Sequence, residues 1–115
     1  MNRHLILWLS FLSCLATPAF SQSKVIAPGA GLRQLSAEYT FTEGPAVDAT
    51  GNVYFTDQPN DRILKWSAAD GSLSTYMQDA GRANGLYFDH QGNLLACADE
   101  QNQLWRIGPD KQVTV

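Results

Sequence analysis

The stretch Phe41–Asp57, FTEGPAVDATGNVYFTD, decides the fold predicted for this chain. It contains two short, mostly apolar segments, Pro45–Asp48 and Val53–Thr56, joined by the polar turn Ala-Thr-Gly-Asn. Glycine in such a turn supplies the positive φ that a β-hairpin needs. An acidic residue, Glu43, stands directly before the Gly-Pro pair that opens the first segment. The stretch therefore predicts a hairpin with a carboxylate at its entry.

The same pattern recurs further along the chain. Moving the sequence by 41 residues (92 − 51 = 41) places Gly51-Asn52 on Gly92-Asn93 and Asp48 on Asp89. The shift also places Glu43 on Asn84. A spacing of about 40 residues is typical of one four-stranded blade of a β-propeller. The repeat predicts two such blades, one after the other.

The other strands follow from short runs that alternate apolar and polar residues or are apolar throughout. No helical apolar period of useful length follows residue 21. The sequence therefore predicts an all-β fold, a β-propeller with about two four-stranded blades over residues 38–115. The remaining predicted strands are Arg62–Trp66, Leu73–Met77, Leu86–Asp89, Leu94–Ala98, Gln103–Ile107 and Gln112–Val115.

The N-terminus has the pattern of a secretory signal peptide over residues 1–21. Its apolar run is too short to span a bilayer, and Ala19-Phe20-Ser21 offers small residues for cleavage before Gln22. We expect an exported protein, periplasmic or secreted, with no membrane association after cleavage. Acylation at Cys14 is the alternative processing route. Residues 22–37 form an N-terminal segment, and the strand-like part of Leu32–Tyr39 is a candidate closing strand for a last blade.

Composition excludes some classes of partner. The chain has a formal net charge of −3 and 17% charged residues, which is typical of a globular protein. Since no basic run is present, nucleic acid and anionic membranes are not expected partners. Cys97 lies in an apolar run, which predicts a small buried side chain. The aromatic residues Tyr54, Trp66 and Trp105 are expected to pack between blades.

Two blades alone leave strand faces that only neighbouring blades can bury. We therefore expect the chain to be an N-terminal portion of a longer propeller, and residues 22–115 alone to fold poorly. A cooperative thermal transition in a monomeric sample would contradict that expectation.

The phrases FTEGPAVDATGNVYFTDQPNDRILKW and ANGLYFDHQGNLLACADEQNQLWRI resemble the opening of the gluconolactonase family, which includes regucalcin (senescence marker protein). The resemblance covers residues 38–115. It implies a six-bladed propeller that binds one divalent cation, commonly Ca²⁺, with Zn²⁺ or Mg²⁺ possible, and that hydrolyses sugar lactones. Glu43 matches the position of the family's first metal ligand. The other ligands and the general base are expected in later blades, so no catalytic residue is assigned here.

Other candidate residues have structural alternatives. Asn84 is a candidate substrate-binding residue by its repeat position, and a turn asparagine is the alternative. Arg82 is expected to be an exposed loop charge, although it is near enough to reach a channel mouth. Asp57 and Asp61 are expected to satisfy turn amides, and His90 has no zinc-spaced partners. The rival function is a non-catalytic, NHL-like propeller that binds a ligand or a protein, because fold alone does not fix activity. Oligomeric state is not predicted.

Overall fold

The computed structural model describes residues 26–115. The predicted signal peptide, its cleavage site and Cys14 lie outside this range. The chain divides into two units at Arg33/Gln34, and both blades belong to the second unit. Across residues 26–115, we find no helix that is long and apolar enough to cross a membrane.

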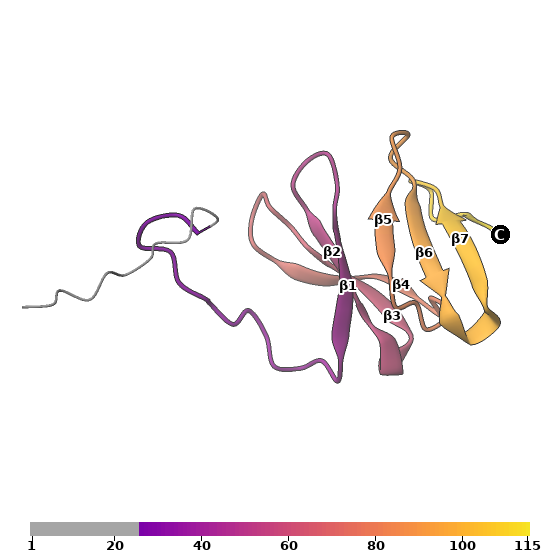
Figure 1. Ribbon diagram of the computed structural model, residues 1–115, viewed down its shortest axis with the longest axis horizontal. Coiled ribbons are helices and arrows are strands. Elements are labelled where there is room, and N and C mark those ends of the chain that lie inside the picture. Colours follow the sequence, from indigo (N-terminus) through magenta and orange to yellow (C-terminus); the bar gives the residue numbers. More distant parts are fainter. Residues whose placement is uncertain (1–25) are drawn as a thin grey trace, which may run out of the picture. The chain divides into compact units, whose positions relative to one another are not determined.

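The first blade is a four-stranded antiparallel sheet with the strand order β1-β2-β3-β4 (Figure 1). A β-bulge interrupts the pairing of β1 with β2 between Glu43 and Ala46, and a short 3₁₀ helix, η1, links β2 to β3. The bounds are β1 Thr42–Val47, β2 Val53–Asp57, η1 Gln58–Asn60, β3 Arg62–Trp66 and β4 Leu73–Gln78.

The second blade repeats this arrangement in the order β5-β6-β7-β8. Even the backbone at the end of the 3₁₀ helix repeats, because Asp61 and Asn102 both adopt positive φ one residue after it. The bounds are β5 Leu86–Phe88, β6 Leu94–Ala98, η2 Asp99–Gln101, β7 Gln103–Ile107 and β8 Val113–Thr114. The predicted all-β architecture of two four-stranded blades is confirmed.

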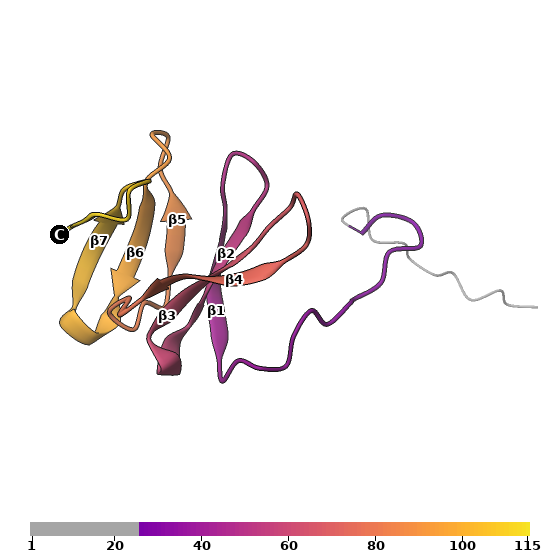
Figure 2. The ribbon, with the colours of Figure 1, turned by 180° about the vertical axis from the view of Figure 1, so that it is seen from behind.

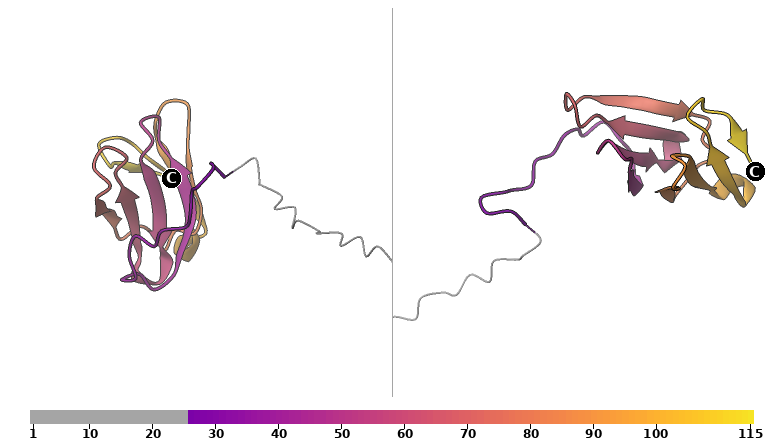
Figure 3. Two further views of the ribbon diagram at one scale, coloured as in Figure 1. Left: turned by 90° about the vertical axis from the view of Figure 1, so that its left-hand side faces the viewer. Right: turned by 90° about the horizontal axis from the view of Figure 1, so that it is seen from above.

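The two blades meet through their inner strands. β1 and β5 contact each other, and β5 also contacts β2. The sheets remain separate layers when seen from behind (Figure 2) and from above (Figure 3, right). The core lies between them: Tyr54 packs edge-on against Tyr76 of its own blade and Phe88 of the next, each with ring centroids 4.9 Å apart. Tyr54 therefore packs between blades, as predicted.

The structure differs from the sequence-based predictions at Leu32–Tyr39, Cys97 and Trp66. Leu32–Tyr39 contains no strand in the structure, because no neighbouring strand offers it backbone hydrogen bonds; its role in closing a last blade stays a prediction. Cys97 is exposed, so its predicted burial is wrong. It occupies the face of β6 that points away from the first blade. Trp105 packs against the inter-blade core as expected, whereas Trp66 lies on the opposite face of the first blade.

Candidate functional site

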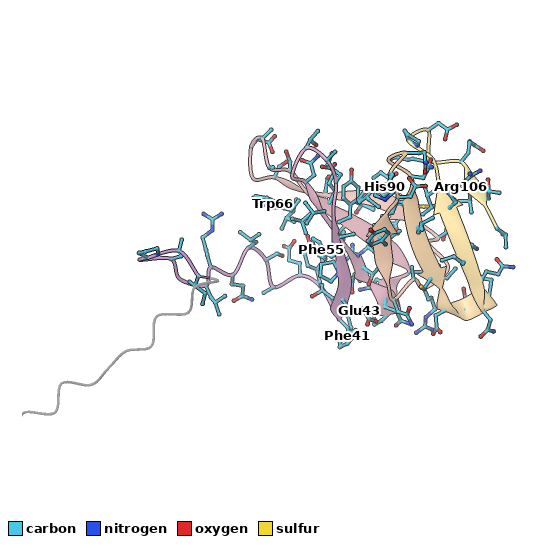
Figure 4. The ribbon with its side chains drawn as sticks, turned by 45° about the horizontal axis from the view of Figure 1, so that its top comes forward. Phe41, Glu43, Phe55, Trp66, His90 and Arg106 are labelled. Carbon is cyan, nitrogen blue, oxygen red and sulfur yellow. The ribbon has the colours of Figure 1, made fainter. Side chains whose placement is uncertain are left out.

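The two ends of the blade pair differ in what they carry. One end, called here the inlet end, holds the starts of β1 and β5, both 3₁₀ helices and the linker of residues 79–85. The other end, called the hairpin end, holds the four tight turns within the blades. Figure 4 shows Glu43 and Phe41 at the first of these ends and His90 at the second. The residues predicted to bind a metal and a substrate, Glu43 and Asn84, are both at the inlet end.

Glu43 is the second residue of β1, the innermost strand of its blade. Its backbone is held in place: Glu43 pairs with Thr56 across the sheet, and the Thr56 hydroxyl donates to the Glu43 carbonyl at 3.1 Å. The Glu43 side chain is half-buried. The bulge that follows ends regular pairing at this residue, and bulges commonly re-aim a side chain at a strand end. The backbone that carries the Glu43 carboxylate is thus fixed at the entry of an inner strand.

Gly44 brings this carboxylate next to the second blade. It has a φ of +57°, which favours glycine, and a Cβ built on it would lie 2.7 Å from the carbonyl oxygen of Asn84. The inner strand of the first blade therefore touches the start of the second. Only glycine allows the two chain segments to approach this closely, and the approach brings the Asn84 backbone against the residue that follows Glu43.

Asn84 is itself held by its backbone. Its N–H donates to the Cys97 carbonyl at 3.2 Å, and the Cys97 N–H donates to the Gly85 carbonyl at 2.9 Å. These bonds extend the β5–β6 ladder to the inlet end. The Asn84 side chain is exposed and carries no hydrogen bond within the described residues. Its amide is thus solvent-accessible at the inlet end, and its role in substrate binding stays a prediction.

Asp57 anchors the chain entering the first blade. It is fully buried and accepts hydrogen bonds from the Thr40 and Phe41 amides, at 3.1 and 3.2 Å. It also pairs with Arg62, whose Nη2 lies 2.8 Å from its Oδ2. Burial raises the pKa of Asp57, but hydrogen bonds from Asn60, Arg62 and the two amides outweigh burial, so this pKa lies below its ordinary value. Asp57 therefore has a structural role, as predicted, but the backbone amides that it binds belong to Thr40 and Phe41 and not to its own turn.

The linker between the blades is tied to both 3₁₀ helices. The Asp61 carboxylate accepts a hydrogen bond from the Arg82 backbone N–H. Arg82 Nη2 donates to Gln58 Oε1 at 3.3 Å, and the Glu100 N–H donates to the Gly81 carbonyl at 3.2 Å. Asp61 thus has the structural role expected of it, and Arg82 is an exposed charge whose hydrogen bond holds it against η1.

The inlet end fits a divalent cation in the type of its donors but not in their number. Glu43 and Asn84 offer carboxylate and amide oxygens, which are hard ligands suited to Ca²⁺ or Mg²⁺. Within residues 26–115, however, no three His, Cys, Asp or Glu side chains gather closely enough to hold a metal ion. A complete site at this end therefore needs oxygens from outside this blade pair.

A cleft of about 350 Å³ opens at the hairpin end, away from Glu43. Its wall includes Tyr54, Tyr76 and Phe88, and its rim includes Asp48 and His90. Burial raises the pKa of Asp48, but hydrogen bonds from Asn52 and Thr50 lower it to about 2. The Asp48 carboxylate accepts hydrogen bonds from its own turn, and among residues 26–115 no metal-binding cluster includes His90. The cleft therefore carries none of the chemistry predicted from the sequence.

Comparison with known proteins shows which solved structures these blades resemble. No family model and no curated protein matches the sequence. Among solved structures, a gluconolactonase from Xanthomonas campestris matches 70% of this chain at 27% identity and a TM-score of 0.65. A putative gluconolactonase matches 76% of this chain at 36% identity and a TM-score of 0.68. The resemblance to the gluconolactonase family is confirmed.

A virginiamycin B lyase from Staphylococcus aureus also matches, over 64% of this chain, at 19% identity and a TM-score of 0.54; this likeness shows the fold alone. The chain spans 27% and 30% of the two gluconolactonase-type structures and 25% of the lyase. The gluconolactonase-like blades described here are therefore a minority of the propeller in those relatives.

The contact of Gly44 with Asn84 is the feature of the site that sequence reasoning missed. The 41-residue shift aligns Gly44 with Gly85, but the sequence analysis gave neither glycine a role. The signal was present in the spacing, since two glycines at equivalent inner-strand entries permit close strand approach. The spacing could not show which backbone atoms occupy the position of a side chain at Gly44.

Proposed function

We propose that this chain supplies two blades of an exported, divalent-cation-dependent hydrolase of sugar lactones. The observation that carries the proposal is Glu43 at the entry of an inner strand, directly before the glycine that touches the Asn84 backbone, in a chain 36% identical to a putative gluconolactonase over 76% of its length. Glu43 matches the first metal ligand of that family. Export is supported by the signal-peptide pattern of residues 1–21.

Glu43 is the residue of this chain that would hold the cation, which we expect to be Ca²⁺, with Zn²⁺ or Mg²⁺ as alternatives. Such an ion polarises a lactone carbonyl and stabilises negative charge on its oxygen. The task of the chain is to hold the Glu43 carboxylate in place before the ion arrives. The Thr56 hydroxyl and the bulge after Glu43 support that task through the backbone.

Asn84 would bind the substrate and would take no part in proton transfer. An exposed amide offers one acceptor and two donor hydrogens, a combination that matches the hydroxyl groups of a sugar ring. The hydrogen bond from the Asn84 backbone N–H to the Cys97 carbonyl fixes the backbone from which this side chain extends. No general base is assigned among residues 26–115, and that role is expected from later blades.

The alternative is a non-catalytic, NHL-like propeller that binds a ligand or a protein. The comparisons do not favour it, because two of the matching structures carry gluconolactonase names. A scaffold also has no need of a carboxylate fixed at the inner-strand entry. The alternative nevertheless predicts a distinct result, namely binding of a ligand without turnover.

The test compares Glu43→Gln with the unchanged sequence in a closed propeller that contains these two blades. Hydrolysis of sugar γ- and δ-lactones is followed by acid release, in Ca²⁺, Zn²⁺ or Mg²⁺ and after chelation. We expect chelation to abolish turnover and Glu43→Gln to lower kcat/KM at least about 100-fold, since even outer-shell changes at metal sites cost 10–100-fold. Glu38→Gln, outside the blades, is the matched control and should keep full activity. Turnover that survives both chelation and Glu43→Gln would contradict the proposal.

A further inference from the structure

The strand that carries Glu43 is hydrogen-bonded on one side. β1 lies at the edge of its sheet and, among the described strands, pairs with β2 alone. Glu43 is its second residue, and the bulge that follows interrupts the pairing between Glu43 and Ala46. Because strand ends open locally at little cost in free energy, so short a paired segment would fray unless the chain before it were anchored.

Asp57, the last residue of β2, provides that anchor. Its Oδ1 accepts hydrogen bonds from the Thr40 and Phe41 amides at 3.1 and 3.2 Å. The Gln58 N–H then donates to the Phe41 carbonyl at 3.2 Å. Phe41 is therefore held at both its amide and its carbonyl, two residues before Glu43 at the same end of the blade (Figure 4).

The second oxygen of Asp57 fixes the carboxylate itself. Oδ2 accepts hydrogen bonds from Asn60 Nδ2 at 2.9 Å and from Arg62 Nε and Nη2 at 3.0 and 2.8 Å. Asn60 Nδ2 also donates to the Thr40 hydroxyl at 2.9 Å. Since the carboxylate is fully buried and its orientation is set by residues of η1 and β3, the anchor is in place without any cation.

The second blade holds its entry in a different way. The 41-residue shift (98 − 57 = 41) places Asp57 on Ala98 and Thr40 on Gly81. Ala98 is fully buried, and a Cβ built on Gly81 would lie 2.8 Å from the Ala98 Cβ. Direct packing and the backbone bond from Glu100 to Gly81 therefore replace the carboxylate. A blade entry does not need a buried acid, and of these two blades it is the one with the candidate metal ligand that has it.

We propose that Asp57 is a positioning residue for Glu43: by fixing the chain just before β1, it holds Glu43 where a cation at the inlet end requires it. Asp57 acts through the backbone, because both of its oxygens already accept hydrogen bonds. A ligand that is held in place before the ion arrives loses little conformational freedom on binding, which raises affinity without a new contact. The consequence for the cation rests on the proposed function, whereas the anchoring of β1 does not.

The experiment titrates Ca²⁺ into a closed propeller that contains these two blades, followed by calorimetry. Asparagine at position 57 replaces one acceptor oxygen by an NH₂ donor, so it cannot serve both the strand amides and Arg62. We expect Asp57→Asn to raise the Kd for Ca²⁺ at least about tenfold, the lower end of the loss seen when outer-shell partners of a metal site are removed. Asp48→Asn is the matched control, since its carboxylate is also hydrogen-bonded but lies at the hairpin end. This control should lose stability and keep its Kd.

A milder variant and a metal-free measurement cover the case in which Asp57→Asn does not fold. Asn60 is exposed, so Asn60→Ala removes its bonds to Asp57 and Thr40 without opening the core. We expect its Kd for Ca²⁺ to lie between those of the unchanged protein and Asp57→Asn. Without Ca²⁺, the Thr40 and Phe41 amides should exchange hydrogen faster in Asn60→Ala, while the Asn52 amide in the far hairpin should not.

The outcomes separate this inference from the proposed function. Loss of Ca²⁺ binding in Glu43→Gln, with a Kd unchanged in Asp57→Asn and Asn60→Ala, would overturn the positioning role and leave the function standing. An equal rise in Kd in Asp48→Asn would also overturn the role, because overall stability would then explain the effect. Ca²⁺ binding that Glu43→Gln leaves intact would contradict the proposed function, and the role of Asp57 toward the cation with it.

Discussion

Gly44 is the residue that sets the distance between the inner strands. Its position combines positive φ with a backbone neighbour in the place of a side chain, whereas Gly92 combines a φ of +82° with empty space. Comparing substitutions at these two glycines therefore separates the cost of backbone strain from the cost of steric crowding. At Gly44 both effects act, and the crowding falls on the segment that carries Asn84.

Gly44→Ala should consequently cost more stability than Gly92→Ala. Both substitutions force an L-residue into left-handed backbone, at roughly 1–2 kcal/mol. Gly44→Ala adds an overlap with the Asn84 carbonyl, which overpacking data suggest costs about 1–3 kcal/mol more. Urea unfolding of the two variants measures the difference. Equal losses of unfolding free energy would show that the inner strands do not meet as closely as described.

Several individual residues were predictable from sequence because their partners are local. Asp48 and Asp89 precede equivalent turns, and both accept hydrogen bonds within their own turn, as their repetition indicated. Cys97 was not predictable from its apolar neighbours. Which face of a strand is buried depends on what packs against the sheet, and the amino-acid sequence of β6 alone does not specify that.

At the scale of elements, the hairpins form from their own residues. In the first, the Asp48 N–H and carbonyl pair with Asn52 and Gly51, while its carboxylate accepts from Thr50 and Asn52. Such side-chain to backbone bonds make the turn largely independent of the rest of the fold. The strand bounds were accordingly predicted to within about three residues, while the 3₁₀ helices were read only as turns.

The Asp48 turn predicts an acid-dependent loss of stability. Its pKa is about 2 in the folded protein, below the ordinary 3.8, so its carboxylate stabilises the fold above about pH 4. That stabilisation is lost as the pH falls from about 4 to 2, because the unfolded chain binds the proton more tightly. Asp48→Asn should flatten Tm against pH in this range. The slope will not vanish, because Asp57, Asp70 and Asp89 also have lowered pKa values. A slope unchanged in Asp48→Asn would contradict the role of this turn.

At the scale of the whole molecule, the repeat predicted the blades and their order, since each blade is a local hairpin array. The repeat did not predict what covers the outer faces of the two blades. Sequence spacing gives the order of strands within a blade, and it does not identify what packs against that blade. The expectation that a single chain of residues 22–115 folds poorly stays a prediction.

The central claim is that Glu43 holds a divalent cation at the inlet end of a propeller. A crystal of the closed propeller grown with Ca²⁺ tests it most directly, through the anomalous signal of the ion. The account predicts a peak about 2.3–2.6 Å from a Glu43 carboxylate oxygen, the usual Ca²⁺–oxygen distance, and its loss in Glu43→Gln. A Glu43 side chain turned to solvent with no peak beside it, in crystals that hold Ca²⁺ elsewhere, would contradict the claim.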